Sequence, residues 1–374
     1  MHISSTFDAG NIEVVSAIDP QNIELKIRKD TNSDFLQWFY FRLQGAQGID
    51  LKIEILNASE CSYPEGWVDY QAVASYDRIT WFRIPTLYDG EKLTFEFMPE
   101  YNSVFLAYFA PFSYDQHLDL LSAAQMSPNA LLVNIGKTVQ GRDLDMLVIG
   151  NEEDTKKRIW IIARQHPGES MAEWFIEGFL NRLLDDHDPV SKKLLQKAVF
   201  YVVPNVNPDG TILGNLRTNA AGTNLNREWG TPDPEKAPEV FHILNAMESA
   251  GVDFNLDIHG DEALPYNFIS SIEGIPSYDA HLKLLDEKFS ANWEKINPDF
   301  QTKHGYPKNE VGKANLNICA KAIGEKFKCL SMTIEMPFKD NADFPDEIFG
   351  WSPQRSMKLG ASVLNPIMDI VDDL

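Results

Sequence analysis

Two short segments of the 374-residue sequence place a glutamate three residues after a histidine: His166-Pro-Gly-Glu169 and His259-Gly-Asp-Glu262. Catalytic zinc commonly takes three histidine or carboxylate ligands and keeps one position open for water. His166, Glu169 and His259 would supply such a set. Each residue also has a structural explanation, because His259 could be a hydrogen-bonded residue at a strand end, and Glu169 could be an acidic residue that favours a helix N-terminus.

A further candidate, Glu335, lies in the apolar run CLSMTIEM. An isolated carboxylate among apolar strand residues is unfavourable unless it is paired or functional. Its functional interpretation is a general base that takes a proton from water at the metal. The structural alternative is a glutamate that faces solvent from the strand.

Residues 204–230 are rich in Asn, Gly and Pro and follow neither a helical nor a strand period. An irregular segment of this length in a compact domain indicates a functional loop. It contains Arg217, Asn226 and Arg227. A guanidinium can bind a carboxylate through two hydrogen bonds, and a second cation can stabilise a developing oxyanion. Surface arginines in a loop are the alternative for each position.

The elements that must position these residues can be predicted from hydrophobic periodicity. Apolar β-type runs (LDMLVIG, RIWIIAR, AVFYVVPNV, FNLDIHG and CLSMTIEM) alternate with helical patterns at 171–184 and near 236–249, 279–293 and 354–372. This alternation predicts an α/β fold with a mostly parallel sheet and helices on both faces. Catalytic groups favour the carboxyl ends of strands in such sheets, so the strands that lead to His166 and His259 could end side by side.

Residues 1 to about 112 have a different character. Short β-type runs, among them IELKIRK, LKIEIL and LTFEFM, are separated by Gly, Pro, Asn and Asp. Their spacing predicts an all-β, sandwich-like N-terminal domain over 1–112, followed by the α/β domain over 113–374. No catalytic cluster occurs in the first domain, and its aromatic residues are expected in the core.

Composition excludes several classes of function. The 33 basic and 55 acidic side chains leave a net charge of −22, which argues against a nucleic-acid backbone or an anionic membrane as the main partner. No apolar run approaches the roughly 18 residues of a membrane span, and the first residues lack the pattern of a signal peptide. Three scattered cysteines, Cys61, Cys319 and Cys329, are expected to be reduced buried thiols. We therefore expect a soluble, cytoplasmic protein.

The order of these features resembles the zinc metallocarboxypeptidase family (peptidase family M14) over most of residues 113–374. The most specific part is NPDGTILGNLRTNAAGTNLNREW, which is similar to the loop signature of that family. The β-rich third, with WFYFRL and FAPFSY, is similar to the N-terminal domain of the cytosolic carboxypeptidase subfamily. The resemblance implies a mixed sheet of about eight strands between helices and one zinc ion per chain.

Site residues carry over by their position in the motifs. The resemblance implies that His166, Glu169 and His259 bind zinc and that Glu335 is the catalytic glutamate. It implies further roles in the irregular loop: Arg217 polarises the scissile carbonyl, and Asn226 and Arg227 hold the substrate's terminal carboxylate.

Two features depart from the pancreatic-type members. Gly168 stands where those enzymes carry an arginine within the HxxE stretch. Tyr306, 29 residues before Glu335, is the candidate for the substrate-facing tyrosine, although the separation is larger than in those enzymes.

A basic segment suggests the specificity. Residues 303–328 contain six lysines and two acids, a net charge of +4, so the rest of the chain carries −26. A basic segment on an acidic protein could attract an acidic substrate to the cleft. We therefore predict a preference for C-terminal Glu or Asp, with Lys313 or Lys321 as a contact. A solvated helix face is the alternative.

Together these features predict a zinc-dependent metallocarboxypeptidase that cleaves the C-terminal peptide bond of peptides or proteins, with a deglutamylase-like preference. One alternative is an amidase or deacylase of N-acyl amino acids that uses the same metal ligands. Another is a catalytically inactive peptide-binding module. The sequence does not specify the oligomeric state.

Overall fold

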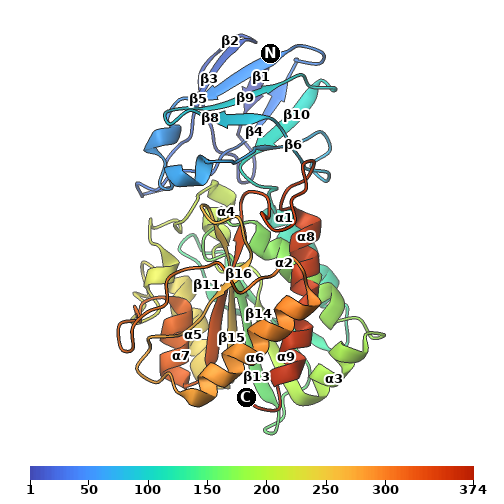
Figure 1. The fold of residues 1–374 in the computed structure, drawn as a ribbon, viewed down its shortest axis with the longest axis vertical. Coiled ribbons are helices and arrows are strands. Elements are labelled where there is room, and N and C mark those ends of the chain that lie inside the picture. Colours follow the sequence, from blue (N-terminus) through green and yellow to red (C-terminus); the bar gives the residue numbers. More distant parts are fainter.

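The computed structural model describes all 374 residues, and its N-terminal third lies on one end of a larger α/β unit (Figure 1). The N-terminal third contains two five-stranded sheets. The first has the order β1 (His2–Ser4), β4 (Tyr40–Gln44), β10 (Ser103–Ala107), β6 (Val73–Ser75) and β7 (Phe82–Arg83). The second has the order β2 (Glu13–Asp19), β3 (Asn22–Lys26), β5 (Leu51–Ile55), β9 (Leu93–Phe97) and β8 (Thr86–Tyr88). Apolar residues of both sheets share one core, in which Phe39 lies 5.7 Å from Phe95 between ring centroids.

The larger unit is built on one seven-stranded sheet. Its order is β11 (Ala130–Lys137), β12 (Asp143–Ile149), β14 (Ala198–Val203), β13 (Lys157–Ala163), β15 (Phe254–Asp261), β17 (Leu330–Pro337) and β16 (Phe268–Ser270). The four strands β14, β13, β15 and β17 are mutually parallel. The strands at both edges are antiparallel to their neighbours.

The sheet is mixed, as expected, but it is not mostly parallel, because three of its six strand pairings are antiparallel, and it has seven strands rather than about eight. The run LDMLVIG, predicted as a strand of the sheet, is β12 and pairs antiparallel on both sides. A short turn joins it to β11, and two strands joined this closely can only be antiparallel. Beyond β16, where an eighth strand would lie, the structure has a single parallel bridge between Asn267 and Phe300.

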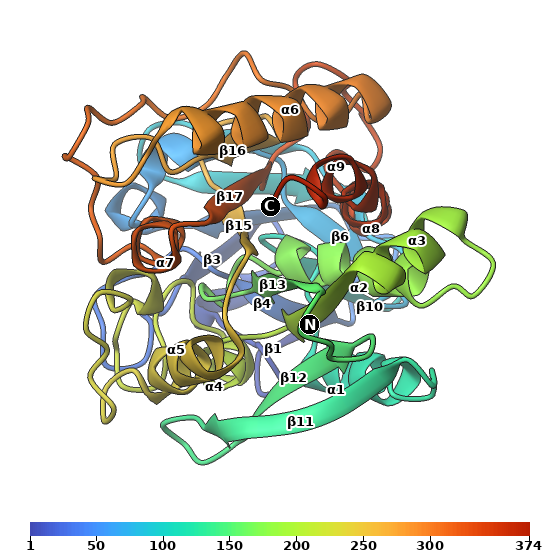
Figure 2. The same cartoon turned by 90° about the horizontal axis from the view of Figure 1, so that it is seen from below.

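Helices cover both faces of this sheet, as Figure 2 shows for α2, α8 and α9 on one side and α5 and α7 on the other. The helices are α1 (Tyr114–Ala124), α2 (Met171–Leu183), α3 (Pro189–Lys197), α4 (Pro208–Leu213), α5 (Pro238–Ala250), α6 (Ala280–Ile296), α7 (Cys319–Phe327), α8 (Pro353–Ser362) and α9 (Leu364–Ile370). Three short 3₁₀ helices span Ala58–Glu60, Pro64–Trp67 and Leu225–Arg227. The predicted irregular segment 204–230 thus contains α4 and one 3₁₀ turn.

Neighbouring residues of the central strands alternate between two cores. Ile159 and Ile161 of β13 lie in the larger core with α2, α6, α8 and α9, whereas Trp160 and Ile162 lie in the smaller core with α5 and α7. Because side chains alternate across a strand, a strand covered on both faces is apolar at most positions, with exceptions such as Asn255 and Asp257 of β15. This is the physical reason for the near-continuous apolar runs.

The β-sandwich packs on the carboxyl-terminal side of the central strands. Tyr108, just after β10, stacks on Phe338, just after β17, with ring centroids 4.3 Å apart. The guanidinium of Arg83 donates hydrogen bonds to the backbone carbonyls of Phe338, Lys339 and Trp351. The larger apolar core is continuous across this contact. The end of the sheet at which the candidate residues were expected is therefore also the end that contacts the N-terminal third.

Two further observations concern the whole chain. None of the helices combines the length and the hydrophobicity that crossing a bilayer requires. All three cysteines are buried and unpaired.

Candidate metal centre and active site

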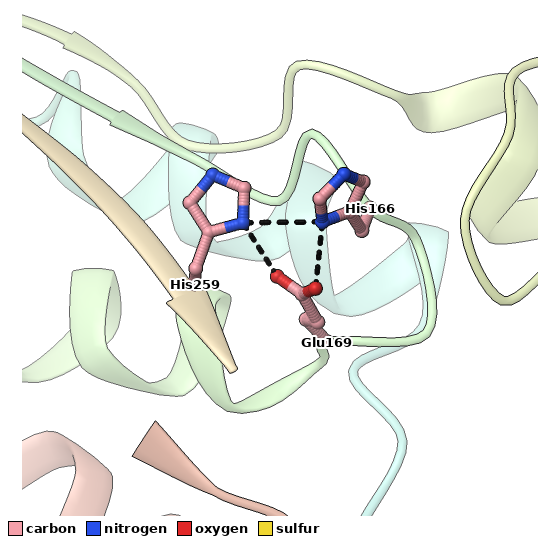
Figure 3. A group of neighbouring side chains, drawn as sticks. All are labelled: His166, Glu169 and His259. Atoms are coloured by element: carbon pink, nitrogen blue, oxygen red, sulfur yellow. Dashed lines mark hydrogen bonds and ion pairs between the residues drawn. The ribbon is translucent and has the colours of Figure 1, made fainter. Parts of the chain in front are cut away.

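Three of the predicted residues converge at the carboxyl ends of β13 and β15 (Figure 3). His166 and Glu169 lie in the turn between β13 and α2, and His259 lies in β15. His166 Nδ1 is 2.6 Å from Glu169 Oε1, His259 Nδ1 is 2.8 Å from Glu169 Oε2, and the two Nδ1 atoms are 3.2 Å apart. All three side chains are buried.

The outer nitrogens of both rings contact oxygen acceptors. His259 Nε2 lies 2.9 Å from Asp257 Oδ2, and His166 Nε2 lies 3.1 Å from Asn224 Oδ1. These oxygens favour a proton on each Nε2, and both Nδ1 atoms face the Glu169 carboxylate. The three groups face one point, so a proton or a metal ion must lie between the nitrogens and the carboxylate. Two imidazole nitrogens and a carboxylate are a donor set that zinc takes. Tetrahedral zinc ligands lie about 3.3 Å from one another, so the two N···O separations of 2.6 and 2.8 Å would widen when an ion is held.

The charges around this centre agree with that donor set. Burial and the nearby Arg217 guanidinium lower the pKa of His166 to about 4, which keeps its ring neutral. The pKa of His259 is raised despite burial, because Asp257 and Glu169 flank its ring. A cation at Nδ1 would take the place of that proton.

Glu335 lies beside the three residues. It is on β17 directly opposite His259 in the parallel pair of β15 and β17, and its side chain is buried. Burial and the neighbouring carboxylates Glu169, Asp261 and Glu262 raise the pKa of Glu335. The centre thus gathers several carboxyl groups, and a divalent cation would favour their ionised form.

Arg217 reaches the centre from the irregular segment. Burial opposes its charge, but Tyr63, Glu262 and Glu169 together raise the pKa of its guanidinium. The guanidinium has no hydrogen-bond partner among the protein groups of the structure and lies over the rings of Phe35 (5.6 Å) and Tyr63 (5.4 Å) of the N-terminal third.

Asn226 and Arg227 follow in the 3₁₀ turn. Asn226 Oδ1 accepts a hydrogen bond from the backbone N–H of Cys319 at the start of α7 (2.8 Å), while its amide NH₂ group has no protein partner. The exposed Arg227 donates one hydrogen bond to the Asn226 carbonyl. Partial burial of its guanidinium and the like charge of Arg217 lower the pKa of Arg227.

Tyr306 packs against Phe268, with ring centroids 4.9 Å apart, and Phe268 is paired with Glu335 across β16 and β17. Its hydroxyl donates a hydrogen bond to Asp261 Oδ2 (2.5 Å). Burial, together with Glu335 and Asp261, raises the pKa of Tyr306. The tyrosine lines a cavity of about 380 Å³ between β16 and α6.

The six lysines of 303–328 separate in the structure. Only Lys321, at the start of α7, is buried and lines the cavity without an ion-pair partner, and burial lowers its pKa to about 8. Lys308 also lines the cavity and pairs with Glu273 (2.6 Å). Lys303 and Lys313 are exposed and lie outside the cavity lining, and Lys326 and Lys328 pair with acids elsewhere.

Three residues around the centre were not predicted from the sequence: Asp257, Asn224 and Tyr63. A signal existed for Asp257, because residues two apart on a strand share a face and Asp257 precedes His259 by two. No comparable pattern marks Asn224. Tyr63 lies in the N-terminal third, about one hundred residues before the first metal-ligand motif, where separation along the chain hides its contact with Arg217.

Two protein-family profiles match this chain. The profile described as zinc carboxypeptidase matches residues 116–356. The profile described as cytosolic carboxypeptidase N-terminal domain matches residues 3–109.

Individual proteins that are similar to this chain are also carboxypeptidases by name. A crystal structure of a metallo-carboxypeptidase from Burkholderia cenocepacia is 49% identical, with a TM-score of 0.98 and 100% coverage of both chains. A metallo-carboxypeptidase from Pseudomonas aeruginosa, solved in complex with (2-guanidinoethylmercapto)succinic acid, is 44% identical, again with a TM-score of 0.98 and full coverage of both chains. Cytosolic carboxypeptidase 6 of Caenorhabditis elegans is 28% identical over 370 residues, which are 89% of this chain and 78% of the relative.

Proposed function

The chain belongs to the zinc carboxypeptidase family (peptidase family M14), and from this premise we propose that it uses one zinc ion to hydrolyse the last peptide bond of peptide or protein C-termini. The observation that carries the proposal is the convergence of three metal-ligand side chains beside the buried Glu335. We further propose that it acts in the cytoplasm, as the name of the Caenorhabditis elegans relative suggests.

In this proposal His166 Nδ1, His259 Nδ1 and the Glu169 carboxylate hold the ion. When bound, zinc supplies Lewis-acid chemistry that polarises the substrate carbonyl and makes water nucleophilic near neutral pH. Asp257 and Asn224 hold the two imidazole rings in the tautomer that leaves Nδ1 free.

The chain's own residues would carry the remaining steps. The Asn226 amide and the Arg227 guanidinium bind the terminal carboxylate and hold the last peptide bond in place. Glu335 takes a proton from the attacking water, whose oxygen bonds to the carbonyl carbon. Arg217 donates to the oxyanion that develops. The C–N bond then breaks, and Glu335 passes the proton to the leaving amine.

We propose that Lys321 contributes a preference for C-terminal Glu or Asp. The support is its buried ammonium group, which lines the cavity next to Tyr306 and has no ion-pair partner. A substrate carboxylate would supply the missing partner, and a hydrogen bond between charged groups is worth about 1.5–3 kcal/mol. Lys313 stays a second candidate for the same role.

A preference for basic C-terminal residues is the competing specificity. Glu273, Asp286, Glu287 and Glu294 line the same cavity. The ligand of the Pseudomonas aeruginosa relative carries a guanidino group as well as a succinic acid moiety. These two observations favour a cationic substrate side chain.

A peptide panel tests both the activity and the specificity. Blocked peptides that differ only in the last residue (Glu, Lys, Phe, or an amidated end) would be incubated with the protein, with and without a chelator. We expect chelator-sensitive release of one C-terminal residue and none from the amidated peptide. No release from any peptide by protein that holds one zinc per chain would contradict the carboxypeptidase proposal.

Replacing Lys321 with methionine should identify the pocket. We expect Lys321→Met to lower kcat/KM for the Glu peptide by about 10–100-fold and to leave the Phe peptide within about threefold, since the side chain keeps an unbranched apolar stem of nearly the same length and loses the ammonium group. Lys326→Met, on the exposed face of the same helix, is the charge-matched control. Equal rates on the Glu peptide for both variants would exclude Lys321 as the residue that binds the acidic side chain. Lys313→Met would then test the second candidate.

A further inference from the structure

The backbone around Arg217 is held from outside the α/β unit by one carboxylate. Asp30, in the loop between β3 and β4, is buried and accepts four hydrogen bonds from three consecutive residues. The backbone N–H groups of Leu216, Arg217 and Thr218 donate at 2.6, 2.8 and 3.0 Å, and the Thr218 hydroxyl donates at 3.1 Å. Successive backbone N–H groups that point at one anion form a concave binding site, which here fixes the backbone at Arg217.

The same segment is tied to the metal-ligand turn. The backbone carbonyl of Leu216 accepts a hydrogen bond from the N–H of Gly168 (2.8 Å), between His166 and Glu169. A Cβ atom at Gly168 would lie 2.9 Å from that carbonyl oxygen. The approach therefore requires glycine at this position, which explains why the arginine of the pancreatic-type enzymes is absent here. Leu216 alone therefore links Asp30 to the turn that carries two of the proposed zinc ligands, because its N–H donates to Asp30 and its carbonyl accepts from Gly168.

The Arg217 side chain is also oriented from the N-terminal third. Its guanidinium lies over the rings of Phe35 and Tyr63, and no protein group accepts a hydrogen bond from it. Its direction is therefore determined by the backbone position, which Asp30 holds, and by the two rings. A cation over an aromatic face is attracted to the ring without using its N–H groups, which stay available for a substrate oxygen.

We propose that Asp30 is a positioning residue for Arg217. The N-terminal β-sandwich then contributes directly to the active site, because it supplies the carboxylate that holds the backbone at Arg217. This inference rests on the proposed function, because it assigns to Asp30 an effect on the step in which Arg217 stabilises the oxyanion. It predicts a loss in kcat, since Asn226 and Arg227, which would bind the terminal carboxylate, lie beyond the three residues that Asp30 contacts.

A second contact between the two units does not involve Arg217, so its loss tests whether any weakening of the interface lowers activity. Asn32 Nδ2 donates to the carbonyl of Ala220 (2.9 Å) and touches neither Arg217 nor a backbone N–H of the loop. Asn32 has a positive φ of 56°, a conformation that glycine adopts without strain. Asn32→Gly therefore removes one contact between the units and leaves the Asp30 site intact, which makes it the matched control.

The test combines kinetics with hydrogen exchange. In Asp30→Asn, which keeps the shape of the side chain, we expect kcat on the best panel peptide to fall by about 10–100-fold, because a small misplacement of a catalytic group has an effect of that order, while KM changes less than about threefold. Asn32→Gly should stay within about twofold of wild type. Amide exchange in a peptide covering 214–220 should be faster in Asp30→Asn and unchanged in Asn32→Gly.

A double-mutant cycle separates positioning from folding. In an Arg217→Met background, Asp30→Asn should change kcat by less than about twofold, because its effect passes through Arg217. An equal loss of kcat in both backgrounds, or unchanged exchange of the 214–220 amides, would overturn the inference. If Asp30→Asn does not fold, Thr218→Val removes one of the four hydrogen bonds and should give a smaller loss with the same dependence on Arg217.

The two proposals fail in different ways. If wild-type protein releases no residue from any peptide, the proposed function is wrong, and the exchange measurement still decides whether Asp30 holds the loop. If wild type is active and the Asp30 variants match it in kcat and in exchange, the inference about Asp30 alone is wrong.

Discussion

Glu335→Gln should reduce kcat by about 10²–10⁴-fold, the range that a positioned general base contributes, while the protein keeps one zinc ion per chain. Glutamine has the same shape as glutamate but cannot accept the proton of the attacking water. Glu335 lies beside His259 on the neighbouring strand and is not one of the three converging ligands, so the metal site should survive. The measurements are kcat on the peptide panel, zinc content and the midpoint of thermal unfolding.

Glu262→Gln is the matched control. Glu262 is another buried carboxyl group of the same cluster, and burial raises its pKa to about 8. We expect a reduction of kcat below about tenfold, since no proton transfer is assigned to it. If the two variants have similar rates, or if Glu335→Gln retains wild-type activity, Glu335 is not the base.

His259→Ala should abolish both zinc binding and activity. Two ligands would remain of the three whose donor atoms lie within 4.8 Å of one another, and catalytic zinc commonly needs three protein ligands. Zinc content after dialysis against a weak chelator is the direct measurement. Added zinc should also raise the unfolding temperature of wild type but not of the variant, because a ligand stabilises the folded state only if it binds to that state.

Asp257→Asn provides the graded comparison. Its side chain contacts His259 on the side away from the proposed ion (2.9 Å). Loss of such a partner typically weakens metal affinity by about 10–100-fold without removing a ligand. Wild-type affinity in Asp257→Asn would remove this residue from the site, and one zinc retained by His259→Ala would contradict the proposed ligand set.

The tertiary structure gives the N-terminal third a role at the candidate site that its sequence does not indicate. Its sequence shows short strands and aromatic residues but no group of catalytic side chains. In the folded protein Asp30 binds the backbone of Arg217, and Phe35 and Tyr63 cover its guanidinium. Expression of residues 113–374 alone would therefore lack contacts that the candidate site uses.

Several features of this protein follow from the sequence by itself. Apolar runs identify the central strands, and three- and four-residue spacing identifies the helices, because burial on one or two faces imposes a period on the chain. The strands that lead to His166 and His259 then predict that these two residues can meet, since parallel neighbouring strands end at the same edge. The place of Glu335 in the same site came from the resemblance to the zinc carboxypeptidases and not from these local rules.

Other features depended on the tertiary structure. The antiparallel edges of the sheet, the single buried lysine among six, and the contact of Asp30 with Arg217 all involve segments that are distant along the chain. A hydrophobic period specifies which face of an element is buried but not which partner covers it. A charged side chain has the same sequence pattern whether it faces water or a cavity. Only the packing of the whole chain decides these pairings, because their free energy comes from groups that meet after folding.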